Sequence, residues 1–317
     1  MQQEMTREWV VMKFGGTSVS SVDCWKTICG QVRRNAREGK HVLVVVSALS
    51  GVTDRLTRLC AETVPEDSGS LLSELRNRHL QLLDELGLPV TGDFRERWNE
   101  LAGLLRDRET RLLPEERGLV MAHGELLSSI IGQQALLAAG LDSIWQDARN
   151  LLDAAPESAA DILAVRCDDH VDPGLDSRLS VMGRIHITQG FIASGPDGVT
   201  CLLGRGGSDT SAAYLAARLS AVRLEIWTDV PGIFSADPRI VPEARLLRRL
   251  SYSEAQELAS MGAKVLHPPS LQPAQRHDVP VYIRDTNRPD EAGTCIGNRS
   301  ASEEAQVKGV VSRDNIT

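Results

Sequence analysis

The feature that most restricts the fold is a short, unbroken run of apolar, mostly β-branched residues, VLVVVS at 42–47. A strand that is apolar at every position has no face to offer to water, so it belongs inside a parallel sheet covered by helices on both sides. A second apolar run, WVVMKF at 9–14, ends at Gly15-Gly16, and helical spacing follows over Val22–Glu38. Strand, helix and strand in succession form a βαβ unit, which favours an α/β protein.

The same alternation continues along the chain. Leucines at three- and four-residue spacings predict a helical insertion between Leu71 and Ala139, with Pro114 at the start of a helix. Further strands are predicted at Ser143–Gln146, Asp161–Val165, His186–Phe191, Val199–Leu203, Arg223–Thr228 and Val279–Arg284. Further helices are predicted at Ala212–Leu219, Tyr252–Met261 and Leu266–Gln275. The length of 317 residues suggests two domains or one large α/β domain.

Charge and composition exclude several classes of function. The chain has 35 basic and 43 acidic residues, and a net charge of −8 disfavours binding to nucleic acid. No apolar run approaches the ~20 residues of a membrane span, and residues 1–8 lack the apolar segment of a secretory signal. The six cysteines form no C-x-x-C pair, so we expect reduced thiols and a cytoplasmic location.

Two glycine-rich turns follow predicted strands and are candidates for phosphate binding, at residues 15–18 and 204–208. Glycines let the backbone approach an anion closely, and amides at the next helix N-terminus point toward it. Neither turn fits the P-loop or the dinucleotide pattern, so each alone is also compatible with a plain tight turn. Lys13 can neutralise a transferring phosphoryl group or point to solvent. Arg205 can hold a carboxylate in a bidentate pair, and Asp209 can orient a lysine or a metal ion, or cap a helix.

Seven segments resemble, in order, motifs of the aspartate kinases in the amino acid kinase family. They are KFGGTSV at 13–19, VVSALSGVT at 45–53, GELLS at 124–128, GF at 190–191, LGRGGSD at 203–209, TDVPGIFSADPR at 228–239 and GAKVLHP at 262–268. One such match could arise by chance, but seven in family order could not. Two positions depart from the pattern, because many relatives carry an acidic residue where Pro231 stands and a tyrosine where Phe234 stands.

The resemblance implies an α/β fold, namely a three-layer α/β/α sandwich with a mixed, mostly parallel eight-stranded sheet in two lobes. It implies one kinase domain over residues 1–299, with an amino-acid lobe at about 1–222 and a nucleotide lobe at about 223–299. Residues 300–317 are expected to be a linker and the truncated start of a C-terminal regulatory or fused region, because single-function aspartate kinases usually continue into paired ACT modules. The chain also resembles the kinase part of bifunctional proteins fused to homoserine dehydrogenase or diaminopimelate decarboxylase.

The implied activity is ATP-dependent phosphorylation of the side-chain carboxylate of L-aspartate to 4-phospho-L-aspartate, the first step of lysine, threonine and methionine biosynthesis. The implied catalytic residues are Lys13, Asp209 and Lys264. The implied amino-acid pocket consists of Ser47, Thr53, Glu125, Phe191, Arg205, Gly206 and Ser208. The implied nucleotide site consists of Lys13, Gly15, Gly16, Thr228, Asp229, Phe234, Arg239 and Lys264. The cofactors would be ATP and Mg²⁺, with the ion held mainly through phosphates rather than in a protein cage, and a homodimer is expected.

Two other interpretations stay open. A kinase for glutamate or N-acetylglutamate could share the fold, and Glu125 separates these substrates because it can pair with a free ammonium but not with an acetylated nitrogen. A non-catalytic module that binds ATP or an amino acid and regulates a partner is the other. Lys13, Asp209 and Lys264 argue against it, since a sensor need not keep phosphoryl-transfer groups.

Overall fold

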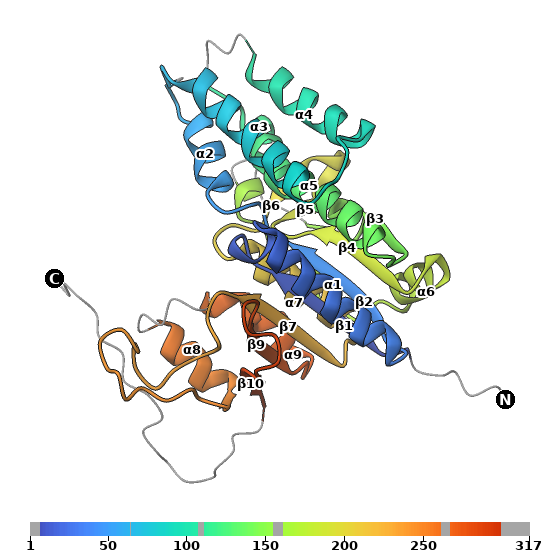
Figure 1. Ribbon diagram of the computed structural model, residues 1–317, viewed down its shortest axis with the longest axis vertical. Helices are drawn as coiled ribbons and strands as arrows, with labels where there is room; N and C mark the ends of the chain where they lie inside the picture. The colour runs from blue at the N-terminus through green and yellow to red at the C-terminus, as the bar shows by residue number, and fades with distance from the viewer. Residues whose placement is uncertain (1–6, 64, 107–110, 155–160, 261–266, 299–317) are drawn as a thin grey trace.

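An eight-stranded sheet runs through the molecule in the order β3-β4-β2-β1-β7-β9-β10-β8 (Figure 1). The computed structural model describes residues 7–63, 65–106, 111–154, 161–260 and 267–298. The strands of the sheet are β1 (Trp9–Phe14), β2 (His41–Val46), β3 (Ser143–Gln146), β4 (Ile185–Gln189), β7 (Arg223–Thr228), β8 (Arg249–Ser251), β9 (Val281–Asp285) and β10 (Thr294–Gly297). Neighbouring strands are parallel except β9 and β10, which pair antiparallel. The predicted mixed, mostly parallel eight-stranded sheet is therefore confirmed.

Helices cover both faces of this sheet. The α-helices are α1 (Val22–Arg37), α2 (Val52–Leu59), α3 (Ser68–Glu85), α4 (Gly92–Leu105), α5 (Pro114–Ala138), α6 (Pro173–Met182), α7 (Gly207–Arg218), α8 (Tyr252–Ser260) and α9 (Gln272–Arg276). Short 3₁₀ helices are η1 (Thr17–Val19), η2 (Ala148–Asn150), η3 (Asp161–Leu163), η4 (Pro196–Gly198) and η5 (Pro268–Leu271). Among the described residues, none of the helices is both long enough and apolar enough to cross a membrane.

The alternation of side chains along β1 explains the two cores. Val10, Met12 and Phe14 face one way and pack with α1 and α5, whereas Trp9 and Val11 face the other way and pack with α6 and α7. The helices α8 and α9 extend the second core beneath β7 and β9. Since both faces of the sheet are buried, every residue of β1 is buried, as the continuous apolar run predicts.

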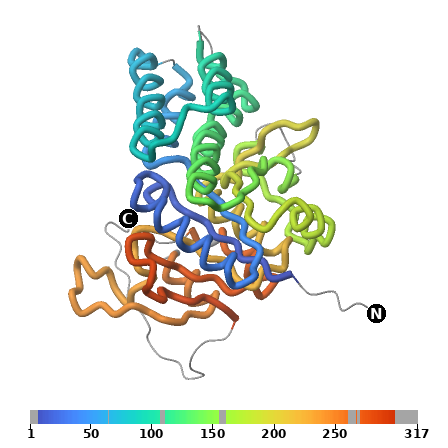
Figure 2. Tube along the Cα trace, turned by 45° about the vertical axis from the view of Figure 1, so that its right-hand side comes forward, coloured from blue at the N-terminus to red at the C-terminus, as the bar shows by residue number. Residues whose placement is uncertain are grey.

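The helical insertion forms one end of the molecule. The helices α2, α3 and α4 gather around the long helix α5, while the chain after β7 lies at the other end (Figures 1 and 2). Pro114 is the first residue of α5, where its missing amide hydrogen leaves no bond unmade. The prediction of a helical region between Leu71 and Ala139 is thus correct in kind, and it separates β2 from β3.

Some predicted elements are wrong. Asp161–Val165 was expected to be a strand, but Ala164 N donates to Asp161 O at 2.9 Å and closes a 3₁₀ turn instead. The expected helix Leu266–Gln275 is, within the described residues, a 3₁₀ turn η5 followed by the five-residue helix α9. Pro268, Pro269 and Pro273 lack the amide hydrogen that a continuous α-helix uses.

Other elements were placed imperfectly. The run Val199–Leu203 contains β6 (Thr200–Leu202), which pairs with β5 (Ile192–Ser194) in a separate two-stranded sheet rather than joining the main one. Strands β8 and β10 and helices α2 and α6 were not predicted, because their apolar periodicity is short. Residues 299–317, with the predicted linker, and Met261 at the end of a predicted helix lie outside the described residues.

Candidate active site

The ion pair between Lys13 and Asp209 is the centre of the site. Lys13 is on β1, on the face that Trp9 and Val11 share, and Asp209 is in the first turn of α7, which packs on that face. Lys13 Nζ lies 2.6 Å from Asp209 Oδ1, and the two side chains are only 11% and 14% exposed. The lysine therefore has a counter-charge before any phosphate arrives, and no hydrogen bond in the described residues fixes its ammonium.

Glu125 approaches the same edge of the sheet from the opposite face. It lies on α5 and is buried, with its Oε1 accepting a hydrogen bond from Ala48 N at 3.1 Å. Its Oε2 is buried without a hydrogen-bond partner in the described part of the chain. Burial raises the pKa of Glu125 to about 8, although the Ala48 amide and the nearby charge of Lys13 oppose that shift. A ligand that donates a charged hydrogen to Oε2 would complete this carboxylate.

The first glycine turn fits tightly between two stretches of backbone. A Cβ on Gly16 would lie 2.9 Å from the carbonyl oxygen of Ala48, and one on Gly15 would lie 3.6 Å from Lys13 Nζ. The amide of Gly15 already donates to Trp227 O at 3.1 Å, so Gly15 contributes space beside the lysine rather than a free donor. Ser47, directly after β2, donates its amide to Phe14 O at 3.1 Å, which holds it beside the turn.

The second glycine turn is held by Phe191. Phe191 has φ of 72°, a left-handed conformation that is rare outside glycine and often marks a functional site. Its amide donates to Ser211 Oγ at 2.8 Å, and its carbonyl accepts from Leu203 N at 2.8 Å. A Cβ on Gly207 would lie 2.5 Å from the Phe191 ring, so the ring packs directly on the start of α7. This contact fixes the helix that carries Asp209.

The polar residues of this second turn differ in exposure. Ser208 is half-buried and packs on Gly190, whose Cβ would lie 2.6 Å from that of Ser208. Gly206 has φ of 71° and packs against His267. Arg205 is exposed, and its guanidinium has no ion pair with any residue that the structure describes. It is available to an anionic ligand.

The predicted nucleotide residues occupy a more open segment after β7. Thr228 ends β7 and donates from Oγ1 to Asp229 Oδ1 at 3.2 Å, and Asp229 is exposed. Phe234 is half-buried and forms a β-bridge with Leu246. The side chain of Arg239 is 83% exposed and pairs with Asp237, two residues away, at 2.7 Å.

The structure thus brings some predicted residues together and leaves others apart. Lys13, Asp209 and Glu125 form one electrostatic cluster, and the two glycine turns flank it. Thr53 is half-buried at the start of α2, behind the turn at Gly51. Lys264 lies outside the described residues. His267, three positions later in the sequence, packs on Gly206.

Three residues near the site had no role assigned from the sequence. They are Ala48, whose amide binds Glu125, and the buried hydroxyl pair Ser18 and Thr286. Ser18 stands within the opening motif, and Thr286 directly follows β9. The carboxyl ends of parallel strands meet at the same edge of a sheet, so the residues that follow the predicted strand Val279–Arg284 were also candidates for the site.

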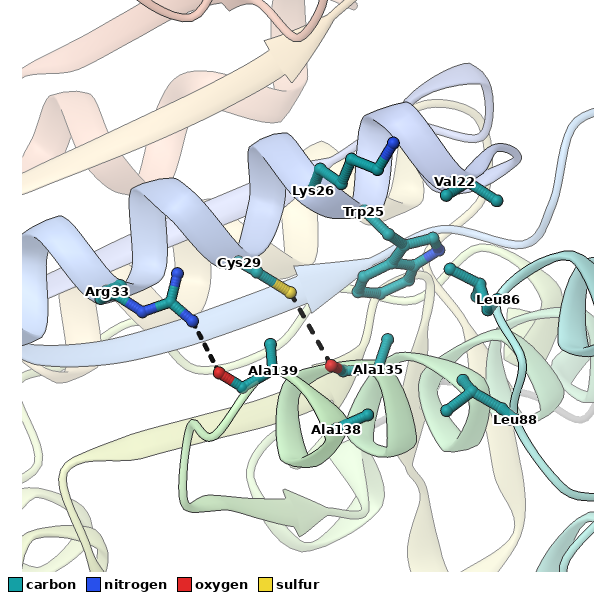
Figure 3. Close-up of a pocket in the computed structure, with 10 residues that line it drawn as sticks. All are labelled: Val22, Trp25, Lys26, Cys29, Arg33, Leu86, Leu88, Ala135, Ala138 and Ala139. Carbon is teal, nitrogen blue, oxygen red and sulfur yellow. Dashed lines mark hydrogen bonds between the residues drawn. The ribbon is translucent and has the colours of Figure 1, made fainter.

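A groove elsewhere on the molecule is distinct from this cluster. It has a volume of about 400 Å³ and lies between α1 and the end of α5, with Trp25, Leu86 and Leu88 on its walls (Figure 3). Arg33 donates to Ala139 O at 2.6 Å within it. Because α1 and α5 cover the opposite face of the sheet from α7, the groove is separate from the pair of Lys13 and Asp209, which lies on the α7 face.

Comparison with known proteins gives a consistent result. The profile of the amino acid kinase family matches residues 8–285. The chain is 34% identical over 304 residues to lysine-sensitive aspartokinase 3 of Escherichia coli, covering 92% of this chain and 65% of that protein. It is 36% identical to the chloroplastic bifunctional aspartokinase/homoserine dehydrogenase 1 of Arabidopsis thaliana, covering 97% of this chain and 35% of that protein.

A solved structure agrees with these relatives. The crystal structure of E. coli aspartokinase III in complex with aspartate and ADP superposes with a TM-score of 0.81 at 34% identity, over 92% of this chain and 65% of that one. The chain therefore spans about two thirds of the first of these relatives and about a third of the bifunctional one. From its matching profile, its fold and these relatives, this chain belongs to the amino acid kinase family.

Proposed function

We propose that this chain is the catalytic region of an aspartate kinase, which transfers the γ-phosphoryl group of ATP to the side-chain carboxylate of L-aspartate. The observation that carries the proposal is the buried carboxylate of Glu125, with one unpartnered oxygen, next to the Lys13–Asp209 pair. This arrangement offers an acceptor for a substrate ammonium beside a cation for phosphate. The E. coli relative, solved with aspartate and ADP, supports the same ligands.

The chemistry asks for positioning and charge neutralisation rather than for a covalent nucleophile. A substrate carboxylate is already ionised at neutral pH, so it attacks the γ-phosphorus without a general base. Lys13 stabilises the charge that spreads over the phosphoryl oxygens, and its ion pair with Asp209 keeps the ammonium near the start of α7. Lys264 is proposed to neutralise the phosphates together with Lys13.

The amino acid is held by groups of both signs. Arg205, which has no ion pair within the described residues, is proposed to bind the α-carboxylate through two parallel hydrogen bonds. Glu125 binds the ammonium, and that charge favours the ionised form of its carboxyl. Ser47, Thr53, Phe191, Gly206 and Ser208 complete the proposed amino-acid pocket.

The nucleotide is proposed to lie against Gly15, Gly16, Thr228, Asp229, Phe234 and Arg239. Mg²⁺ fits here as an ion carried by the nucleotide, because the carboxylate of Asp209 already contacts Lys13 and is not free to serve as a protein ligand. The ion would supply neutralisation of phosphate charge. The proposal includes a homodimer, as expected from the resemblance, and a cytoplasmic location, as expected from six cysteines without a C-x-x-C pair.

The test is turnover of ATP by the chain with Mg²⁺ and L-aspartate, in the presence of hydroxylamine. The expected result is aspartyl hydroxamate and an equal amount of ADP. Glutamate and N-acetylglutamate are assayed in parallel, and a higher kcat/KM with either would assign the chain to another small-acid kinase. Folded protein that binds ATP but releases no ADP would support the non-catalytic module instead.

A further inference from the structure

The end of β9 lies beside the proposed phosphate site, although β9 comes late in the chain and the first glycine turn comes near its start. Thr286 follows β9 and is 1% exposed. Its amide donates to the carbonyl oxygen of Thr228 at 2.8 Å, at the end of β7. Its Oγ1 donates to Ser18 Oγ at 2.7 Å, across a sequence separation of 268 residues. One side chain therefore connects the end of β9 with the first glycine turn.

Ser18 connects Thr286 to the Gly15-Gly16 turn. It is 1% exposed in η1, and its amide donates to Gly15 O at 2.9 Å. Its Oγ donates to Trp227 O at 3.4 Å, and the same carbonyl accepts from Gly15 N at 3.1 Å. The turn is thus bound to β7 through Trp227 and to β9 through Thr286.

The opposite side of the turn is held by a more exposed pair. Ser20 Oγ donates to Gly16 O at 2.6 Å and accepts from Ser50 N at 2.9 Å. Because a Cβ on Gly16 would meet Ala48 O at 2.9 Å, the turn has little space to move toward β2. Movement away from β2 is opposed by the buried bonds of Ser18 and Thr286.

We propose that Thr286 is a positioning residue for phosphoryl transfer. It acts through Ser18 to hold the Gly15-Gly16 turn against the carboxyl end of β7, where the nucleotide is proposed to bind. Thr286 itself does not touch the reacting atoms. This inference rests on the proposed function of the turn. Small displacements of groups that position a reactant lower kcat, so the hydroxyl of Thr286 contributes to the rate and not only to folding.

The test compares Thr286→Val, which keeps the shape and removes the hydroxyl, with Thr286→Ser, which keeps the hydroxyl. We expect Thr286→Val to lower kcat by about tenfold, with little change in the KM for aspartate, and Thr286→Ser to keep more than half of the kcat. Ser18→Ala should have a similar effect, and the double variant should be no slower than the slower single variant, because both remove one connection. Ser180→Ala is the control, since it removes a side-chain hydrogen bond to Asp176 at the other edge of the sheet.

The outcomes separate positioning from simple stability. An unchanged kcat in Thr286→Val would overturn the proposal, as would a lower kcat that follows a lower melting temperature and is not restored by serine. ADP binding by calorimetry is measured on every variant. If the parent chain makes no hydroxamate, the proposed function fails, but about threefold weaker ADP binding in Thr286→Val, restored in Thr286→Ser, still supports the positioning role. Equal ADP affinity in that case would overturn it.

Discussion

The two sides of the proposed site are built differently. On the side where the amino acid would meet the γ-phosphate, Lys13 and Glu125 are buried on a central strand and a long helix, and each is placed by packing on one face of the sheet. On the nucleotide side, Arg239 is 83% exposed in a segment without a helix, and its ion pair is with Asp237, two residues away. Charged groups are costly to bury unless fixed neighbours compensate them. The buried Lys13 and Glu125 are therefore held in place before a ligand binds.

Because of this difference, substitutions of buried and of exposed groups should change different measured quantities. Buried groups with fixed neighbours can stabilise a transition state without reorganisation, whereas exposed groups contribute mainly to binding. Changes to the buried groups should therefore alter stability together with kcat or aspartate binding. Changes to the exposed groups should alter ligand binding alone.

The largest effect is expected for Lys13→Ala. Loss of its charge should lower kcat by about 1,000-fold, with a much smaller change in the aspartate KM. The variant also leaves Asp209 buried without its cation, which should lower the free energy of unfolding by about 3 kcal/mol. Steady-state kinetics measures kcat and the aspartate KM, and urea unfolding measures the free energy of unfolding.

A second substitution separates the two consequences of that change. Lys13→Ala combined with Asp209→Asn should recover stability and remain inactive, because no buried charge is left unpaired. Lys26→Ala serves as the lysine control, since its ammonium is exposed on α1 and pairs with Asp23. A near-normal kcat in Lys13→Ala would contradict the role given to this residue.

Glu125→Gln should raise the aspartate KM by about 100-fold, because a charge-assisted bond to the ammonium is lost. Burial raises the pKa of Glu125 from 4.5 to about 8, so between these values the folded chain holds a proton that the unfolded chain has released. The free energy of unfolding contributed by this group therefore falls as the pH rises through that window. Melting temperatures measured across it should decline less steeply in Glu125→Gln, and identical slopes in the two proteins would contradict a buried, protonated Glu125.

Arg205→Ala should raise the aspartate KM by about 30-fold through loss of a bidentate carboxylate contact. Since Arg205 is exposed, its removal should leave the melting temperature and ADP binding unchanged. Calorimetric titration with aspartate and with ADP measures both. An unaltered aspartate affinity would exclude Arg205 from the amino-acid pocket.

The smallest effect is expected for Arg239→Ala on the nucleotide side. We expect the KM for ATP to rise by about fivefold, while kcat and stability stay near those of the parent, because an exposed ion pair contributes little. If kcat fell instead by as much as in Lys13→Ala, the contrast between the two sides of the site would be wrong.

Local patterns in the sequence predicted much of the fold. The unbroken apolar run of β2 predicted a central parallel strand, and Pro114 predicted the start of α5. The prediction of a strand at Asp161–Val165 is wrong, because four apolar or small residues after an aspartate fit a 3₁₀ turn as well as a strand, and tertiary contacts decide between them. Strand β10 has four residues, too few for a periodic pattern.

The site was predicted residue by residue but not contact by contact. Motif order gave Lys13, Glu125 and Asp209, and the structure brings them into one electrostatic cluster. The bond from Ala48 to Glu125 and the pairing of Ser18 with Thr286 depend on which strands are neighbours. Strand order is set by the packing of the whole sheet, so no local pattern could have predicted these contacts.

The antiparallel direction of β10 determines where a label or tether can be attached away from the proposed site. Because β10 runs antiparallel to β9, Gly297 and the exposed Asn298 emerge at the edge of the sheet opposite the two glycine turns. A fluorescent label or an immobilising tether joined at Asn298 would therefore stand away from the loops that meet substrate. Because of the direction of β10, Asn298 is a suitable attachment point for single-molecule or surface measurements of turnover.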